Sequence, residues 1–183
     1  SGKIDKRIAV FVEDEFAANW ITCVIRETAN NHIEEIGVYF VNGDGNAVKI
    51  HTNHNHDPSV KFKSVCFVDG DSQQKDDQEK GVFRLPGTNP EETIFSDVSR
   101  NLDKNIAILT AALQRPLSLQ GKISETIKNV LKTNRDPHIL FNTLGEKLGF
   151  IPEVVVRGAF IEVWIQENPE EVQKIVDPII KML

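Results

Sequence analysis

The sequence predicts an α/β fold in which a small parallel sheet is flanked by helices and followed by a helical carboxy-terminal extension. In the first half of the chain, short apolar runs alternate with segments whose apolar residues recur at helical spacing. In the second half, only the helical spacing remains. Alternating strands and helices imply right-handed crossovers and a parallel sheet covered by helices. We therefore expect an α/β core over residues 3–98 and a helical extension over residues 99–183, packed on that core.

Four apolar runs are expected to form the sheet: Ile8–Val12, Ile36–Val41, Val65–Val68 and Val82–Leu85. Between the first two, Phe16 to Ile25 has the spacing of an amphipathic helix, and Asp14 and Glu15 suit the positive end of its dipole. A short second helix is expected from Ala47 to about His51, after the turn residues 42–46. Residues 51–58 hold three histidines among turn formers, which favours a surface loop over a metal site. The polar residues 72–80 predict a mobile excursion.

Helices are expected from Pro90 onward. Asn89 suits the cap position, Pro90 the first turn, and Glu91 and Glu92 the positive end of the dipole. Apolar residues then mark successive helices around Leu102–Leu113, Ile123–Leu131, Ile139–Leu144, Val154–Trp164 and Val172–Ile180. Pro178 is expected to kink the last of them.

The composition limits the classes of protein to which this chain can belong. Its 183 residues suffice for one domain, or for one domain with a subdomain. The net charge of −6 argues against nucleic-acid binding through a broad basic surface, although an acidic site can reach phosphates through bound cations. No apolar run approaches the roughly 20 residues that cross a bilayer, so we expect a cytoplasmic protein without membrane contact. Ser1-Gly2 is interpreted as a cloning scar on an excised fragment. Cys23 and Cys66 lie in apolar patterns and are expected in the core, not in a disulfide.

Acidic residues follow the predicted strands at their carboxyl ends. Glu13 follows the first strand, Asp69 and Asp71 follow the third, and Glu91 lies beyond the fourth. The functional crevice of a parallel sheet lies outside this edge. Converging carboxylates are the ligands that hard divalent cations prefer. The pattern therefore predicts a site for Mg²⁺ or Mn²⁺.

Two known classes of acidic site resemble this pattern in part. A phosphorelay receiver also ends its first strand in acids, and Asp69 could then be the phosphoacceptor. Against this interpretation, Gly70-Asp71-Ser72 replaces the apolar-proline loop, and no later strand with a lysine is predicted. A haloacid-dehalogenase-like phosphatase has an Asp-x-Asp motif similar to Asp69-Gly70-Asp71. In that class the motif ends the first strand, whereas here it ends the third. The motif is also followed by Thr or Val at the position that Gln73 occupies here.

The arrangement resembles most closely the TOPRIM domain of topoisomerases, primases and nucleases of the overcoming-lysogenisation-defect (OLD) family. Glu13 matches the TOPRIM glutamate, and Asp69 and Asp71 match its aspartate pair. Details are similar to the OLD branch. Val12-Glu13-Asp14-Glu15-Phe16-Ala17 resembles its first motif, Val41-Asn42-Gly43 its glycine turn, and Pro86-Gly87 through Pro90-Glu91 a later segment with a further metal-binding acid. The resemblance covers roughly residues 7–98.

The resemblance implies a divalent-metal-dependent endonuclease that cleaves DNA with two cations. Asp69 and Asp71 would hold one ion, Glu13 would share it or act as general base, and Glu91 would support the second. Glu15, Arg135 and His138 are further catalytic candidates, with Lys132 as an alternative to Arg135. His138 is equally explained as a helix-start residue.

The same resemblance implies a partner within a longer chain. OLD proteins join an ABC-type ATPase to the TOPRIM nuclease, often in phage defence. This sequence holds no phosphate-binding loop, so the ATPase domain would lie outside it. The sequence is also compatible with a homo-oligomer. Ala17 stands where many OLD proteins have an acid, which leaves an inactive TOPRIM-like interaction or dimerisation module as the alternative.

Overall fold

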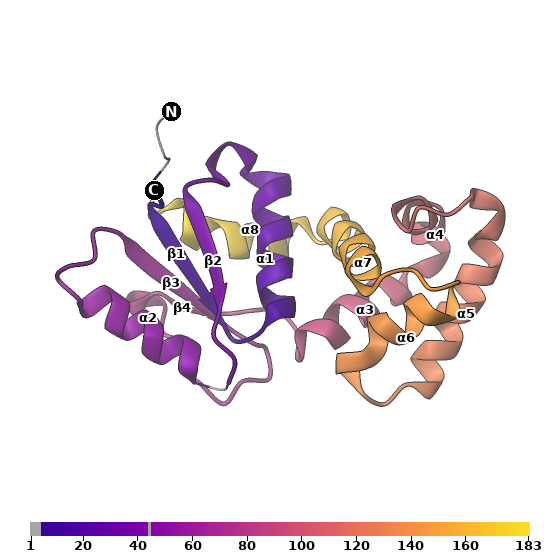
Figure 1. Cartoon of the computed structure of the whole chain (residues 1–183), viewed down its shortest axis with the longest axis horizontal. Helices are drawn as coiled ribbons and strands as arrows, with labels where there is room; N and C mark the ends of the chain where they lie inside the picture. The colour runs from indigo at the N-terminus through magenta and orange to yellow at the C-terminus, as the bar shows by residue number, and fades with distance from the viewer. Residues whose placement is uncertain (1–4, 44) are drawn as a thin grey trace. The chain divides into compact units, whose positions relative to one another are not determined.

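The computed structural model describes residues 5–43 and 45–183 (Figure 1). Residues 1–4, which include the predicted cloning scar and the start of the predicted core, lie outside the described residues, as does Asp44 of the predicted turn. The chain forms two compact units. An α/β unit extends to Pro90 and includes Pro169–Leu183, and a helical unit comprises Glu91–Asn168.

The α/β unit contains a four-stranded, wholly parallel sheet. Its strand order is β2 (Ile36–Phe40), β1 (Ile8–Val12), β3 (Lys63–Val68) and β4 (Val82–Arg84). In register, Val12 of β1 lies opposite Phe67 of β3. The predicted α/β class is confirmed, because this sheet with flanking helices has a Rossmann-like or TOPRIM-like layout, and a helical part is present in the second half of the chain.

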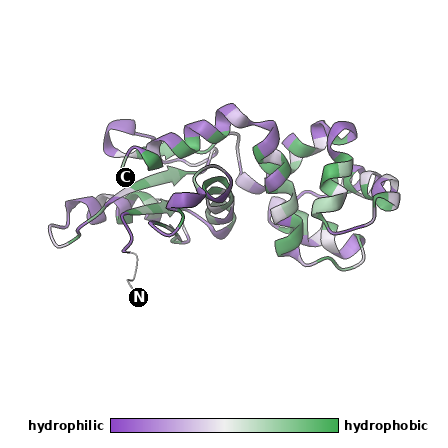
Figure 2. Cartoon of the chain, turned by 90° about the horizontal axis from the view of Figure 1, so that it is seen from above, coloured by the Kyte–Doolittle hydropathy of each residue, from purple (hydrophilic) through white to green (hydrophobic). Residues whose placement is uncertain are grey.

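Both faces of the sheet are covered, which explains why β1 is apolar throughout. Ala9 and Phe11 point to the face covered by α2 (Asn46–His56), where they pack with Ala47. Successive strand residues point to opposite faces, so Val10 points to the other face, along which α1 (Glu15–Thr28) lies (Figure 1). The strand arrow that can be seen in Figure 2 is mainly green, the colour of hydrophobic residues.

Helix α8 (Pro169–Ile180) returns to the α/β unit, which changes the predicted domain boundaries. Its apolar stripe, which includes Val172 and Ile175, is buried, and the helix contacts α1. Burial of apolar surface against a distant helix cannot be inferred from periodicity within α8 itself. At the other boundary, the helical unit begins directly after Pro90, so α3 (Pro90–Arg100) continues into that unit and the division does not fall at residue 98.

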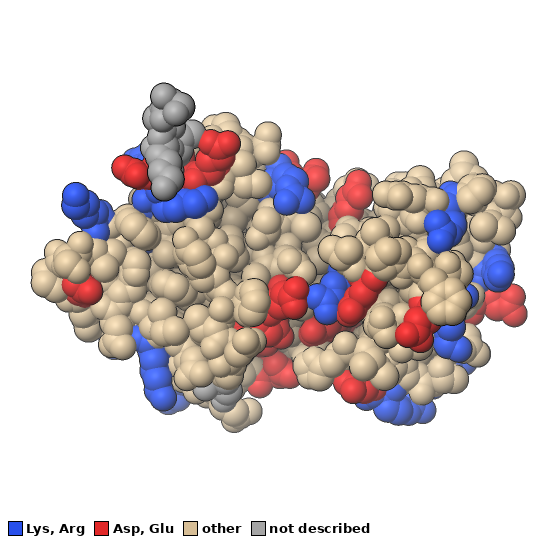
Figure 3. Space-filling model, in the orientation of Figure 1, with Lys and Arg blue, Asp and Glu red and all other residues tan. Residues whose placement is uncertain are grey.

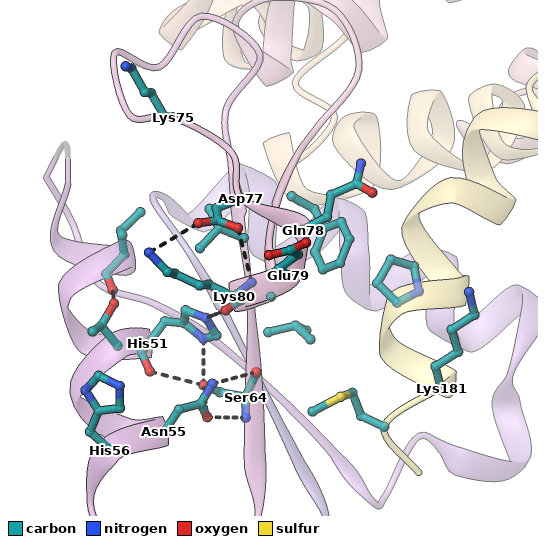
Figure 4. Close-up of a pocket in the computed structure, with 18 residues that line it drawn as sticks. His51, Asn55, His56, Ser64, Lys75, Asp77, Gln78, Glu79, Lys80 and Lys181 are labelled. Carbon is teal, nitrogen blue, oxygen red and sulfur yellow. Dashed lines mark hydrogen bonds and ion pairs between the residues drawn. The ribbon is translucent and has the colours of Figure 1, made fainter.

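Helix α2 continues to His56, so the predicted loop over residues 51–56 is wrong. His51 is buried, and its Nδ1 lies 2.7 Å from Ser64 Oγ on β3 (Figure 4). His54 packs edge-on against Phe11, with ring centroids 5.5 Å apart. These contacts to the sheet stabilise a helix whose own sequence is rich in turn formers.

The helical unit packs around an aromatic cluster. Phe95 and Phe160 stack at 5.3 Å between ring centroids, and Phe141 meets both rings edge-on. The helices of this unit are α3, α4 (Leu102–Ala112), α5 (Gln120–Thr133), α6 (Leu140–Lys147) and α7 (Glu153–Glu167). Short 3-10 turns occur in the chain at Asn30–His32, Gln78–Lys80, Leu117–Leu119 and Pro137–Ile139.

The cysteines and the lengths of the helices bear on two further expectations from the sequence. Cys23 and Cys66 do not form a disulfide with each other, as predicted. Within residues 5–43 and 45–183, no helix combines the length and the apolar character needed to span a membrane.

Candidate functional site

The pairing of β1 with β3 brings Glu13 and Asp69 together. Each residue directly follows its strand, and both carboxyl-bearing side chains are buried, with 8% of the surface of each residue exposed. The backbone N–H of Asp69 donates to Glu13 Oε2 at 3.4 Å, and Ser72 Oγ donates to Glu13 Oε1 at 2.9 Å. Figure 3 shows acidic side chains gathered over this edge of the sheet, beside the start of α1. The juxtaposition matches the expected convergence of these two acids.

The pKa of Asp69 is raised to about 8, so its carboxyl group is mostly protonated at neutral pH. Burial is the largest cause, followed by the negative charges of Asp14 and Glu13, a hydrogen bond with the Glu13 carboxyl group, and the charge of Asp71. Asp69 Oδ1 is buried and has no hydrogen-bond partner among the described residues. A buried acceptor that lacks a donor is costly, so this oxygen suits a cationic ligand.

The other acids near this edge differ in their surroundings. Asp71 is exposed on the loop after β3. Asp14 caps α1, where its Oδ1 accepts from the backbone N–H of Ala17 at 2.8 Å. Glu15 is exposed in the first turn of the same helix. Helix capping and the helix dipole therefore account for Asp14 and Glu15, whereas neither explanation applies to Asp71.

The donor set at this edge fits a hard divalent cation in its chemistry. Glu13 and Asp69 offer carboxylate oxygens, and Asp69 Oδ1 has no hydrogen-bond partner among the described residues. Asp71, two positions after Asp69, carries a further carboxylate. Across residues 5–43 and 45–183, however, no three His, Cys, Asp or Glu side chains are already arranged as a metal-binding group. Two carboxylates are thus in place, and a third would have to come from the Asp71 loop.

Arg84 on β4 forms hydrogen bonds with the loop that carries Asp71. The segment 72–80, predicted as a mobile excursion, is therefore held to the sheet by hydrogen bonds from this arginine. Its guanidinium group donates to four backbone carbonyl oxygens, those of Asp69 (3.0 Å), Gly70 (3.3 Å), Ser72 (3.1 Å) and Gln74. Its Nε also donates to Asp76 Oδ1 at 3.3 Å. Sequence analysis missed this residue, and the available signal was a single arginine in an otherwise apolar short strand.

Gly70 is required by a close backbone approach. A Cβ atom at this position would lie 2.0 Å from the carbonyl oxygen of Gly87, which is backbone and cannot move aside easily. In the structure, the neighbouring loop at Gly87 is the group that makes the contact.

Glu91 and His138, two further predicted site residues, meet within the helical unit. Glu91 is 5% exposed, and its Oε1 lies 3.7 Å from His138 Nδ1. The backbone N–H of His138 donates to Asp136 Oδ1 at 3.0 Å, so the helix-start role is also fulfilled. Arg135 and Lys132 are exposed in the same unit. A protonated His138 would partner the buried Glu91 carboxylate.

A separate pocket of about 730 Å³ opens beside β4, between α2 and the end of α8 (Figure 4). At its base, His51 Nε2 lies 2.7 Å from the Lys80 carbonyl oxygen, which can only accept, so Nε2 carries the proton and Nδ1 accepts from Ser64. Burial lowers the pKa of His51. Both ring nitrogens are therefore used in joining α2 to β3 and to the 3-10 turn at Gln78–Lys80, and His51 has a structural role.

The fold and this edge together define a class: an α/β protein of Rossmann-like or TOPRIM-like layout with buried acids at the carboxyl ends of adjacent central strands. Comparison with models of protein families, with curated proteins and with solved structures finds no match. After β4, the described chain is helical to its end, so it contains no later strand of the kind that bears a receiver's lysine.

Proposed function

We propose that this chain is a divalent-metal-dependent nuclease of the TOPRIM type that hydrolyses phosphodiester bonds in DNA. The observation that carries the proposal is the contact between Glu13 and Asp69, which leaves Asp69 Oδ1 buried and unpartnered among the described residues. Burial and the neighbouring acids raise the pKa of Asp69, and a bound cation would stabilise its charged form. A site that is unfavourable when empty is suited to binding a charge of opposite sign.

The acids have different roles in the proposed reaction. Asp69 and Asp71 would hold one Mg²⁺ or Mn²⁺ ion together with Glu13. Glu91, beside His138 in the helical unit, is the candidate ligand for a second ion. Bound cations of this kind neutralise phosphate charge and lower the pKa of water. Glu13 accepts a hydrogen bond from Ser72 through Oε1, which fixes its carboxylate beside Asp69. We infer that Glu13 can also accept the proton of the attacking water, because a carboxylate held at the site can act as general base.

Helix α5 supplies a surface for the DNA backbone within the helical unit. It exposes Lys122, Lys128 and Lys132 against a single acid, Glu125. Lys128 and Lys132 are four residues apart and therefore share one face of the helix. Figure 3 shows lysine and arginine side chains along the outer edge of this unit. Such a local basic face can contact phosphates although the whole chain is acidic.

The wider setting follows from the resemblance to OLD proteins. We propose that the nuclease is one part of a longer ATP-dependent protein, with an ABC-type ATPase domain elsewhere in that protein, and that it acts in the cytoplasm in defence against phage. Glu15, Arg135 and His138 stay secondary candidates for catalysis. An assembly of two or more copies is compatible with this setting.

A nicking assay tests the proposal. Supercoiled plasmid is incubated with the chain and Mn²⁺, and conversion to the open circular form is measured. Asp69→Asn and Asp71→Asn should abolish cleavage, whereas Asp103→Asn, an exposed aspartate on α4, should cleave like the wild type. Cleavage that persists in both site variants, or that persists after chelation of the metal, would reject the assignment.

A second candidate is an inactive TOPRIM-like interaction or dimerisation module. It is favoured by the lack, among the described residues, of three carboxylates already arranged to hold a metal. On this hypothesis the wild-type chain neither binds Mn²⁺ nor nicks plasmid, and its oligomeric state is unchanged by Asp71→Asn. Sedimentation of the wild type and the variant, alongside the nicking assay, separates the two functions.

A further inference from the structure

We propose that Arg84 is a positioning residue of the acidic site, which holds the backbone before and after Asp71 so that the Asp71 side chain stays close enough to Asp69 to join it in binding a divalent cation. The inference rests on the proposed function and assigns a role to a residue that carboxylate chemistry does not itself require.

Arg84 is anchored where the acidic loop leaves the sheet. It lies on β4 directly opposite Val68, the last residue of β3. Its Nη1 contacts the carbonyl oxygens of Asp69 and Gly70, and thus the first two peptide groups after the strand. The same atom contacts the carbonyl of Ser72, beyond Asp71. Carbonyl groups before and after Asp71, those of Gly70 and Ser72, are therefore bonded to one guanidinium group.

Because Arg84 bonds mainly to backbone carbonyl oxygens, the carboxylate groups of Asp69 and Asp71 stay available to a cation. The hydrogen bonds of the Arg84 Nη atoms go to backbone oxygens, and its one carboxylate contact is with Asp76. A guanidinium bound directly to Asp69 would compete with a cation for the same oxygens. Here it organises the loop while Asp69 Oδ1 is left without a partner among the described residues.

Arginine is specifically suited to this position. Its planar fork directs several N–H donors at fixed angles, whereas a lysine ammonium group is a single point of charge on a flexible stem. The ion pair with Asp76 is a minor part of the arrangement, because Asp76 is exposed and surface ion pairs contribute little. The contacts to the carbonyl groups are therefore expected to carry the positioning effect.

Mn²⁺ affinity, measured by electron paramagnetic resonance of the free ion, tests the inference without reference to activity. Arg84→Gln should weaken Mn²⁺ binding about tenfold or more, since changes in groups that orient metal ligands commonly cost 10–100-fold in affinity. Arg84→Lys should recover part of this loss. Asp76→Asn, which removes the ion pair alone, and Lys80→Gln, an exposed cation on the same loop, should bind Mn²⁺ like the wild type.

Hydrogen exchange of the metal-free chain supplies a second readout. Arg84→Gln should speed exchange of amides in residues 70–76 while the other strands keep their protection. If the wild type binds Mn²⁺ and Arg84→Gln matches it in both affinity and exchange, the inference is overturned although the proposed function stands. If the wild type does not bind Mn²⁺, both the proposed function and the cation-binding role of Arg84 are rejected.

Discussion

Glu13 and Asp69 are 56 residues apart in sequence, yet the backbone N–H of Asp69 donates to Glu13 Oε2 at 3.4 Å. Parallel pairing of β1 and β3 produces this contact, because Val12 and Phe67 lie opposite each other immediately before the two strands end. Burial and mutual repulsion then raise the pKa of Asp69 to about 8. Stability and its pH dependence are thus linked at the edge of the sheet where we propose the cation site.

Replacing Asp69 by Asn should stabilise the metal-free chain at pH 8. The pKa of Asp69 is about 8 in the folded chain and has an ordinary value of 3.8. The folded chain therefore binds this proton more tightly, and the stability that the proton provides is complete below pH 3.8 and lost as the pH rises to 8. We expect a gain on the order of 2 kcal/mol at pH 8, given roughly 1.4 kcal/mol per pKa unit and relaxation among the neighbouring acids.

Urea unfolding of the wild type and of Asp69→Asn at pH 4 and pH 8 measures this effect. The difference between the two proteins should shrink at pH 4, because the wild-type carboxyl group is then protonated in the folded chain and, close to its ordinary pKa of 3.8, partly protonated in the unfolded chain. A variant that is less stable than the wild type at pH 8 would show that the Asp69 carboxylate is a structural acceptor instead.

Mg²⁺ or Mn²⁺ should raise the melting temperature of the wild-type chain. A ligand that binds only the folded state stabilises it by about 2.7 kcal/mol at 100 times its Kd. For a chain of this size, such a gain corresponds to a shift of about 5 °C or more. Differential scanning fluorimetry with increasing metal measures the shift, and Asp71→Asn should reduce it. No shift of the wild type in millimolar metal would argue strongly against a cation site.

Reversing the charge of Lys128 and Lys132 should weaken DNA binding. Both lysines are exposed on α5, and each phosphate contact that is lost should lower the salt dependence of binding by roughly 0.9 in log–log slope. Fluorescence anisotropy of a labelled duplex at several salt concentrations measures affinity and slope. Lys104→Glu, at an exposed lysine on α4, is the charge-matched control for each single reversal, Lys128→Glu or Lys132→Glu. Equal losses in the control and in the α5 variant would indicate a general charge effect and not a specific surface.

Replacing His51 by Leu should destabilise the α/β unit by about 1–3 kcal/mol at neutral pH, because the Lys80 carbonyl oxygen loses the His51 donor and Ser64 Oγ keeps only its other partners, such as Asn55 Oδ1. Burial lowers the pKa of His51 below its ordinary 6.5, so its contribution is present above pH 6.5 and is lost as the pH falls. Urea unfolding at pH 7.5 and pH 5.5 should therefore show a larger difference at the higher pH. His56→Leu, at an exposed position on the same helix, should stay close to the wild type. Equal effects of both replacements would contradict the role of the buried hydrogen bonds.

Local features of the sequence determined most of the secondary structure and the placement of two acids. The apolar runs identified the four strands, and Pro90 marked the start of α3, because strand burial and helix starts depend on residues that are close in sequence. The position of Glu13 and Asp69 at strand ends also predicted their convergence, since parallel strands end at a common edge.

Tertiary structure alone decided the features that depend on distant partners. Helix α8 returns to α1, His51 lies buried against β3, and Arg84 binds carbonyl groups that precede it by ten or more residues. The raised pKa of Asp69 has the same origin, because it arises from burial and from charges on other segments. Periodicity reports which face of an element is apolar, but the partner that covers that face is set by packing in three dimensions, and so are the hydrogen bonds and charges around each acid.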